Sequence, residues 1–214
     1  MWLTFRNYGF SDAADLFVFI SGYSVAFVYA KVMREHGFIA GTTRLLQRAW
    51  QIYVAYVFLF VIYVAAIGYL AQRYNLPQLL DEYNVRGFTD HPFDMLSQGL
   101  LLKFKPVNLD VLPLYIALMV SFPPILWLMT RKPNLTMAGS VLVYFAARQF
   151  GWNLPAYPSG SWYFNPFTWQ LLFISGAWFA LGRPLKLAFL KSRTLLVIGS
   201  TCLLLSLEIG RAHV

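Results

Sequence analysis

Two carboxylates, Asp12 and Asp15, are the first residues whose types and spacing suggest chemistry. They lie three residues apart where a long apolar stretch begins, so a helix places them on one face. One interpretation is structural, because Ser11 or Asp12 can cap the helix and its dipole favours acids in the first turn. The other is that one acid faces a membrane interior, where ionisable groups are costly and usually functional. Arg6 and Asn7 are close enough in sequence to complete such a polar cluster.

A pair of arginines, Arg44 and Arg48, forms a second candidate site. Their spacing of four residues places both guanidinium groups on one face of a helix, just before an apolar stretch. They either anchor that helix at the membrane surface or bind a phosphate-bearing ligand, which paired guanidinium groups suit. Gln51 and Tyr53 extend this polar face into the apolar stretch.

A third group of candidates lies around the start of another apolar stretch. Asn165 and Pro166 have the residue types of an N-cap followed by a first helical position. Trp169 and Gln170 follow one turn later, and the Gln170 amide either bridges two helices or contacts a polar substrate. Trp162 lies in the preceding segment, which is rich in Pro, Gly, Trp and Tyr. Its aromatic residues form either an interfacial belt or a surface on which a sugar stacks.

The sequence lacks the motifs of soluble enzymes. It contains no phosphate-binding loop, no metal-binding pair of histidines, no CxxC motif and no serine elbow. Cys202 is the single cysteine, which excludes an internal disulfide framework and a thiol metal site. We expect no metal and no bound cofactor, and we interpret His36, His91 and His213 as solvated residues of loops or of the chain's end.

The composition is that of an integral membrane protein. The 214 residues are 58% hydrophobic and 12% charged, whereas about a quarter of a typical soluble domain is charged. The net charge of +8 does not indicate nucleic-acid binding, because the basic residues gather in short segments between apolar stretches. That distribution is typical of membrane orientation, and the chain is expected to be one multi-pass domain in a lipid bilayer.

The apolar stretches predict an all-α, polytopic bundle of transmembrane helices with about six spans. The expected spans are residues 12–32, 50–71, 111–130, 135–150, 166–181 and 194–207.

The connecting segments alternate in charge. Segments 31–48, 131–132 and 183–193 are basic, whereas segments 72–110 and 151–165 are close to neutral. The positive-inside rule then places the basic segments in the cytoplasm and residues 1–11 outside, so we expect at least one helix upstream of residue 1. Within the long segment 72–110, an amphipathic helix is expected from about residue 90 onwards.

With these residues assembled, the chain resembles the OpgC-like branch of the membrane acyltransferase-3 superfamily. DLFVFISGY at residues 15–23 is similar to the signature after that superfamily's first helix. RLLQRAWQIY at residues 44–53 is similar to its arginine-rich segment, without the usual proline after the isoleucine. The features typical of the OpgC-like branch are RNYGFSDAAD at 6–15, LPLYIALMVSFPPIL at 112–126 and NPFTWQLLFISGAW at 165–178, so the resemblance covers most of residues 3–182.

This resemblance implies an O-acyltransferase of about ten helices in the bacterial inner membrane. Such proteins move an acyl group from cytoplasmic acyl-CoA to a glycan hydroxyl across the membrane, and the OpgC type is linked to succinylation of periplasmic glucans. The family's catalytic histidine would precede residue 1. We therefore expect residues 1–207 to be a partial, inactive acyltransferase domain. Residues 208–214, which resemble a translated sequencing adapter, are expected to be a non-native tail.

The resemblance assigns roles to the candidates. Asp12 and Asp15 would support the catalytic histidine, because a general base needs a group that orients it. Arg44, Arg48 and Tyr53 would hold acyl-CoA, the donor substrate. The residues expected to bind the glycan acceptor are Arg6, Asn7, Trp162, Asn165, Trp169 and Gln170.

Two other functions fit the same residues. A transporter or flippase of a small polar substrate would line its path with Asp12, Asp15 and Gln170. An inverted repeat of the spans would favour this reading, and the sequence shows no convincing one. A purely structural membrane subunit would leave the arginine pair and the acids without ligands.

Overall fold

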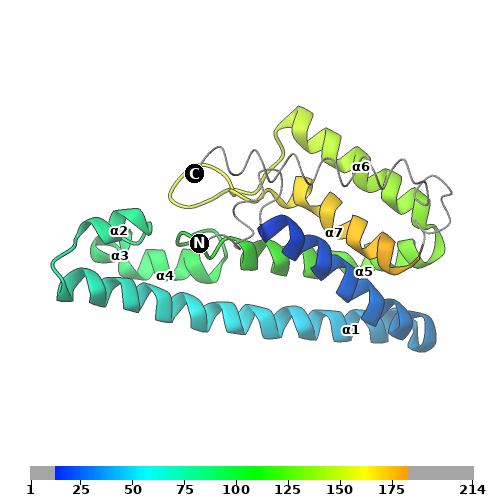
Figure 1. The fold of residues 1–214 in the computed structure, drawn as a ribbon, viewed down its shortest axis with the longest axis horizontal. Coiled ribbons are helices and arrows are strands. Elements are labelled where there is room, and N and C mark those ends of the chain that lie inside the picture. Colours follow the sequence, from blue (N-terminus) through cyan, green and yellow to red (C-terminus); the bar gives the residue numbers. More distant parts are fainter. Residues whose placement is uncertain (1–12, 183–214) are drawn as a thin grey trace, which may run out of the picture. The chain divides into compact units, whose positions relative to one another are not determined.

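The computed structural model describes residues 13–182, and every regular element within them is a helix (Figure 1). Arg6, Asn7 and Asp12, the span predicted at 194–207 and the tail at 208–214 lie outside the described residues. The helices are α1 (Ala13–Arg73), α2 (Gln78–Glu82), α3 (Gly87–Asp90), α4 (Pro92–Leu100), α5 (Val111–Arg131), α6 (Pro133–Phe150) and α7 (Pro166–Ala180).

The predicted all-α class is confirmed for this part of the chain, but the predicted number of spans is not. Two of the described helices, α1 and α5, are long and apolar enough to cross a membrane. The 15 residues of α7 extend about 22 Å at 1.5 Å per residue, which is short of a hydrocarbon core about 30 Å thick. α6 has 18 residues but includes several polar ones, among them Arg148 and Gln149.

Helix α1 consists of two arms, residues 13–36 and 38–73, separated at Gly37. The Gly37 backbone has φ 86° and ψ 172°, a conformation that essentially only glycine adopts. The chain reverses direction at Gly37, and this brings Met33 and Gly41 together on either side of it. A Cβ atom on Gly41 would lie 2.9 Å from the Cβ of Met33. The interpretation of residues 31–48 as a loop was therefore wrong, since all of them except Gly37 continue the two helical arms.

The described residues divide between two compact units. The first unit contains residues 13–41, 124–142 and 170–182, and the second contains residues 42–123 and 143–169.

In the first unit, the first arm of α1 packs against α7 through two glycines. A Cβ atom on Gly22 would overlap the carbonyl oxygen of Phe173, and one on Gly176 would overlap the carbonyl oxygen of Phe19. The backbones therefore approach more closely than larger residues allow, as is common between membrane helices. The two segments run in the same direction (Figure 1).

The second unit has an aromatic core between the second arm of α1, α4 and the start of α5. Its buried members are Tyr56, Phe60, Met95, Phe104, Leu109 and Ile116. Helix α4, which confirms the helix predicted from about residue 90, turns Met95 toward this core and leaves Phe93 exposed. Gly99 allows the close approach, since a Cβ atom there would overlap the ring of Phe60.

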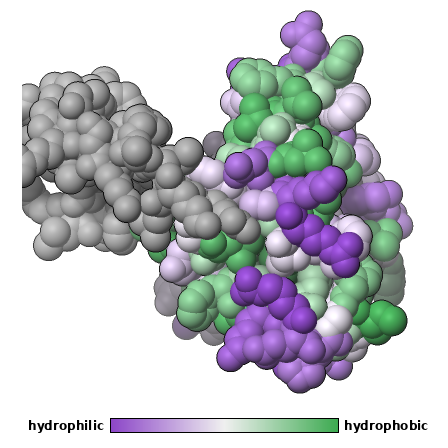
Figure 2. Space-filling model, turned by 90° about the vertical axis from the view of Figure 1, so that its right-hand side faces the viewer, coloured by the Kyte–Doolittle hydropathy of each residue, from purple (hydrophilic) through white to green (hydrophobic). Residues whose placement is uncertain are grey.

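Large apolar side chains are exposed along the helices. Phe27 and Phe58 on α1 and Phe145 on α6 each expose more than 60% of their surface. Figure 2 shows hydrophobic residues exposed beside strongly hydrophilic ones on one face. Soluble proteins rarely expose apolar groups in such numbers, whereas lipid contact accounts for them.

Candidate functional site

Asp15 and Gln170 lie at the same end of the helix pair in the first unit. Asp15 lies in the first turn of α1, one turn before Phe19, and it is half-buried. Gln170 lies about one turn before Phe173 on α7. Because Phe19 and Phe173 both belong to the close contact and the segments run in the same direction, the two polar residues precede it at similar levels. The position of Asp15 also fits stabilisation by the helix dipole.

Gln170 bridges α6 and α7. Its Oε1 accepts a hydrogen bond of 2.7 Å from the Ser140 hydroxyl, and its Nε2 donates one of 2.8 Å to the Ser140 carbonyl oxygen. Both residues are buried. This is the structural alternative that the sequence left open, and it accounts for both atoms of the amide group.

The arginine pair lies on an exposed polar stripe of α1 in the second unit. Arg44 and Arg48 are exposed, and Arg48 Nη1 donates a 3.2 Å hydrogen bond to Gln51 Oε1. Because helical neighbours recur every three to four residues, Arg44, Gln47, Arg48 and Gln51 form one continuous stripe. Charged donors and amide groups thus alternate along the side of one helix.

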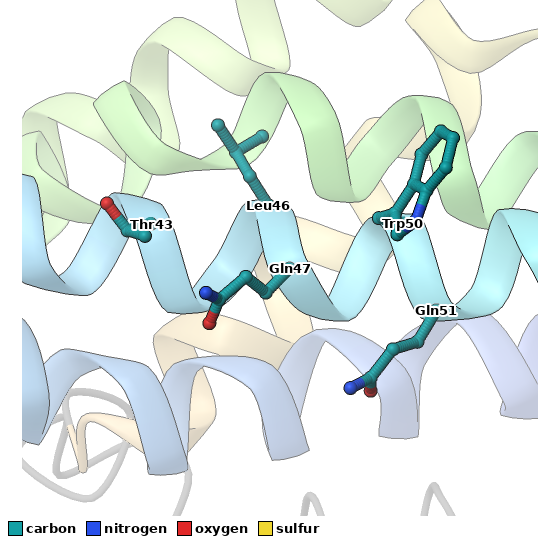
Figure 3. Close-up of a pocket in the computed structure, with 5 residues that line it drawn as sticks. All are labelled: Thr43, Leu46, Gln47, Trp50 and Gln51. Atoms are coloured by element: carbon teal, nitrogen blue, oxygen red, sulfur yellow. The ribbon is translucent and has the colours of Figure 1, made fainter.

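An open groove of about 660 Å³ lies beside this stripe. Figure 3 shows Gln47 and Gln51 pointing to one side of α1 and Leu46 and Trp50 to the other. These four residues and Thr43 line the groove. The groove therefore offers one aromatic ring and two amides.

Tyr53 is tied to α4. Its hydroxyl donates a 3.0 Å hydrogen bond to the Leu100 carbonyl oxygen, and its ring stacks on Trp50 at a centroid distance of 5.4 Å. The structure therefore gives Tyr53 a definite role in holding α4 on α1. Its predicted contact with acyl-CoA remains a prediction.

Trp162 is buried, with 6% of its surface exposed. The Lys105 ammonium nitrogen lies 3.4 Å from the centre of its ring, and the Trp162 carbonyl oxygen accepts a 2.8 Å hydrogen bond from Asn153 Nδ2. One ring face is thus occupied by a cation, which leaves little of Trp162 available for the predicted stacking of a sugar.

Asn165 is the N-cap of α7, as its sequence context predicted. Its Oδ1 accepts a 2.9 Å hydrogen bond from the Phe167 backbone nitrogen, and its Nδ2 donates a 2.6 Å bond to the Trp152 carbonyl oxygen. Trp169 is half-buried and packs edge-to-face against Phe164 at a centroid distance of 4.8 Å. Asn165 and Trp169 thus shape the start of α7.

Sequence reasoning missed two titratable residues in the second unit, Lys105 and Asp110. Both are half-buried, and Lys105 follows the buried Phe104. Desolvation lowers the pKa of Lys105 to about 8, and the attraction of Asp110 partly opposes this shift. Desolvation likewise raises the pKa of Asp110, against the attraction of Lys105. The available signal was a charged residue flanked by an aromatic residue and a proline, which is too weak to identify a site.

Two other titratable groups in the described part of the chain, Asp81 and Arg86, form an exposed ion pair rather than a binding site. Arg86 forms a bidentate ion pair with Asp81; this hydrogen bonding lowers the pKa of Asp81 and raises that of Arg86. Both side chains are exposed, so the pair contributes little to stability. Within residues 13–182, no three His, Cys, Asp or Glu residues gather as a metal site requires.

Comparison with protein families decides which family this helical architecture represents. The OpgC protein family matches residues 1–213, which is nearly the whole chain. The chain belongs to the OpgC family. The predicted resemblance to OpgC-like proteins is thereby confirmed. None of the curated proteins and none of the solved structures with which the sequence was compared gives a significant match.

Membership of the OpgC family bears on where the protein resides and what it does. Together with the two long apolar helices, it indicates a membrane protein and fits an acyltransferase that modifies glucans. In this OpgC-family chain, the polar stripe and the capped start of α7 are parts of the second unit, and Asp15 and Gln170 are parts of the first.

Proposed function

We propose that the protein is an integral-membrane O-acyltransferase of the bacterial inner membrane. It takes an acyl group, with succinyl as the leading candidate, from cytoplasmic acyl-CoA and transfers it to a hydroxyl group of a periplasmic glucan. The family match over residues 1–213 carries this proposal. The six spans predicted from the sequence would then all be parts of one multi-pass bundle.

The donor side of the reaction requires groups that hold the phosphates of CoA. Paired guanidinium groups bind phosphate oxygens well because each presents several donors in a planar fork. The exposed Arg44 and Arg48, with the amides of Gln47 and Gln51 beside the groove, supply such a surface. We assign acyl-CoA binding to this stripe, with Tyr53 at its membrane end.

The acceptor side requires a general base. A glucan hydroxyl attacks the thioester carbonyl carbon, the C–S bond breaks, and the hydroxyl proton ends on the thiol of CoA. A carboxylate near the base would orient it and stabilise its protonated form. Asp12 and Asp15 are assigned this supporting role, and the glucan-binding role extends to Arg6, Asn7, Asn165 and Trp169.

Two of the proposed acceptor residues have other partners. Trp162 is covered by Lys105, and the amide of Gln170 is hydrogen-bonded to Ser140. These bonds also weaken the transporter alternative, in which Gln170 would offer its amide to a substrate along the path.

Comparison of glucans tests the proposed function. Glucans from a host strain without the gene should lack an acyl group that the full-length protein restores, as measured by mass spectrometry. Equal acylation in both strains would refute the proposal.

Arg44→Ala and Arg48→Ala should each raise the KM for acyl-CoA by about ten-fold or more, since each removes a charge-assisted hydrogen bond. Arg73→Ala, at the exposed far end of α1, is the matched control and should leave this KM unchanged.

A further inference from the structure

The last turn of helix α5 holds a cation over an aromatic ring. Trp127 and Arg131 are one turn apart, and the guanidinium carbon of Arg131 lies 4.0 Å from the centre of the Trp127 ring. The ring of Phe38, which directly follows the turn at Gly37, packs edge-to-face against Trp127 at a centroid distance of 6.2 Å. All three residues belong to the first unit. Phe38, Trp127 and Arg131 therefore form one cluster, here called the Trp127 cluster.

The positive charge of this cluster is not neutralised by any acid in the described part of the chain. Arg131 is exposed, and among residues 13–182 its guanidinium group has neither a hydrogen-bond acceptor nor an ion-pair partner. Lys132 is exposed beside it, and residues 124–142 contain no Asp or Glu. The ring of Trp127 covers one face of the guanidinium group, whose N–H donors lie in its plane and point outward. The cluster therefore suits an anion with several acceptor oxygens.

The length of α5 places the cluster at the level of lipid head groups. Its 21 residues extend about 32 Å at 1.5 Å per residue, close to the thickness of a hydrocarbon core of about 30 Å. Arg131 is the last residue of the helix, so it lies at the membrane boundary, with Trp127 one turn inside it. The loop charges predict that this boundary is the cytoplasmic one. Phosphate groups of the inner leaflet are at the same level.

Exposed apolar side chains next to the cluster distinguish a lipid from a free phosphate ion. Ile39, which follows Phe38, exposes 80% of its surface, and Leu135, four residues after Arg131, exposes 60%. Contact with acyl chains would remove these side chains from water, whereas an inorganic phosphate would leave them exposed. The combination of a cation, an interfacial tryptophan and exposed aliphatic groups matches the two chemical parts of a phospholipid.

We propose that the Trp127 cluster binds the phosphate group of an anionic phospholipid in the cytoplasmic leaflet. The amine of a zwitterionic head group would be repelled by Arg131 and Lys132, so a lipid such as phosphatidylglycerol is favoured over phosphatidylcholine. The site is separate from Arg44 and Arg48, which belong to the second unit, and it has no part in the proposed acyl transfer. A bound lipid would link the turn of α1 to the end of α5.

Competition between head groups tests the chemistry of the ligand. The probe is phosphatidylglycerol with a fluorescent acyl chain, and its binding to the detergent-solubilised, full-length protein is followed by fluorescence anisotropy. Unlabelled dioleoylphosphatidylglycerol should displace the probe, whereas dioleoylphosphatidylcholine and soluble glycerol phosphate should compete about ten-fold more weakly or less. Equal competition by phosphatidylcholine would show that charge is not recognised. Equal competition by glycerol phosphate would assign the cluster to soluble phosphates. Either result would overturn the inference.

Variants of the cluster test the assignment to these residues. Arg131→Gln should weaken binding of the probe about ten-fold, because it removes charge-assisted hydrogen bonds to the phosphate. Arg148→Gln is the matched control, an exposed arginine at the other end of α6, and it should bind as wild type does. Binding unchanged in Arg131→Gln, or weakened equally in both variants, would contradict the site.

A second variant covers the case in which Arg131→Gln does not fold. Trp127→Leu retains the positive charge of Arg131 but removes the ring that holds its guanidinium group. It should weaken binding of the probe about two- to five-fold, the effect of losing one cation–π contact. Wild-type affinity in Trp127→Leu would show that the cluster does not hold the lipid.

Discussion

Gln170 joins α6 and α7 through both atoms of its amide group. In a membrane interior, a polar side chain that loses its partner finds no water to replace it. The two bonds to Ser140 therefore account for a glutamine inside an apolar helix without any ligand. Its contribution is to hold two helices in register.

Replacing Gln170 tests this at the residue scale. Gln170→Ala should lower the free energy of unfolding by about 1–3 kcal/mol, because it breaks two buried hydrogen bonds and leaves Ser140 unpaired. Gln149→Ala is the control, since Gln149 is exposed on α6. Denaturation of the detergent-solubilised protein measures the difference, and equal effects of the two variants would contradict the bridging role.

Lys105 predicts a dependence of stability on pH. Its pKa falls from 10.5 in the unfolded chain to about 8 in the folded one, so the unfolded state binds more protons between these values. Stability should therefore rise as the pH increases from about 8 to 10.5, because the folded protein no longer holds a desolvated charge. The raised pKa of Asp110 acts in the opposite sense at acidic pH, outside this window.

Comparison of melting temperatures at pH 8 and pH 10 checks this expectation. Lys105→Met should remove the Lys105 contribution to the rise, whereas Lys103→Met should retain it, since Lys103 is an exposed neighbour. The same rise in wild type and Lys105→Met would assign it to other groups.

At the scale of elements, the contact between the first arm of α1 and α7 depends on two small residues. The Gly22 position faces the Phe173 backbone, and the Gly176 position faces the backbone at Phe19. Neither backbone can move aside as a flexible side chain would. The close approach also fixes the level at which Asp15 and Gln170 lie.

Adding one methyl group tests this contact. Gly22→Ala should lower the free energy of unfolding by about 1–3 kcal/mol through overpacking. Gly68→Ala, in the same helix α1, meets nothing within 4 Å and should be neutral or stabilising, because alanine favours helices over glycine. Thermal unfolding in detergent measures both variants. Destabilisation of similar size in both would mean that the contact is not tight.

At the scale of the whole molecule, the loop charges and the helix order predict which segments face each side of the membrane. Residues 31–48 carry the arginine pair and are expected in the cytoplasm, whereas residues 151–165 are expected outside. The proposed transfer across the membrane requires this opposition, because donor and acceptor reach the enzyme from different compartments.

Labelling of single cysteines checks the orientation. In a Cys202→Ser background, a membrane-impermeant thiol reagent should label Ser159→Cys in intact spheroplasts. Glu35→Cys should react only after the membrane is opened, because basic segments remain in the cytoplasm. Both positions are exposed, so accessibility within the protein is matched. Labelling of both from one side would contradict the predicted topology.

The helical class, the family and most helix positions could be predicted from the amino-acid sequence alone. The observed bounds of α5, α6 and α7 lie within two residues of the predicted ones, because apolar composition and the Asn165-Pro166 start signal are local properties. The N-cap role of Asn165 followed for the same reason. The turn at Gly37 was missed, since a basic segment looks the same whether it is a loop or the ends of two helices.

Which distant residues contact each other could be learned only from the folded structure. Nothing in the local sequence pairs Gly22 with Phe173, Ser140 with Gln170 or Lys105 with Trp162. These contacts depend on how closely separate segments approach and on which polar groups lose water when they do. The local pattern fixes a residue's own helix and its exposed or apolar character, whereas burial beside a particular partner makes it part of a hydrogen-bonded bridge or of a close helix contact.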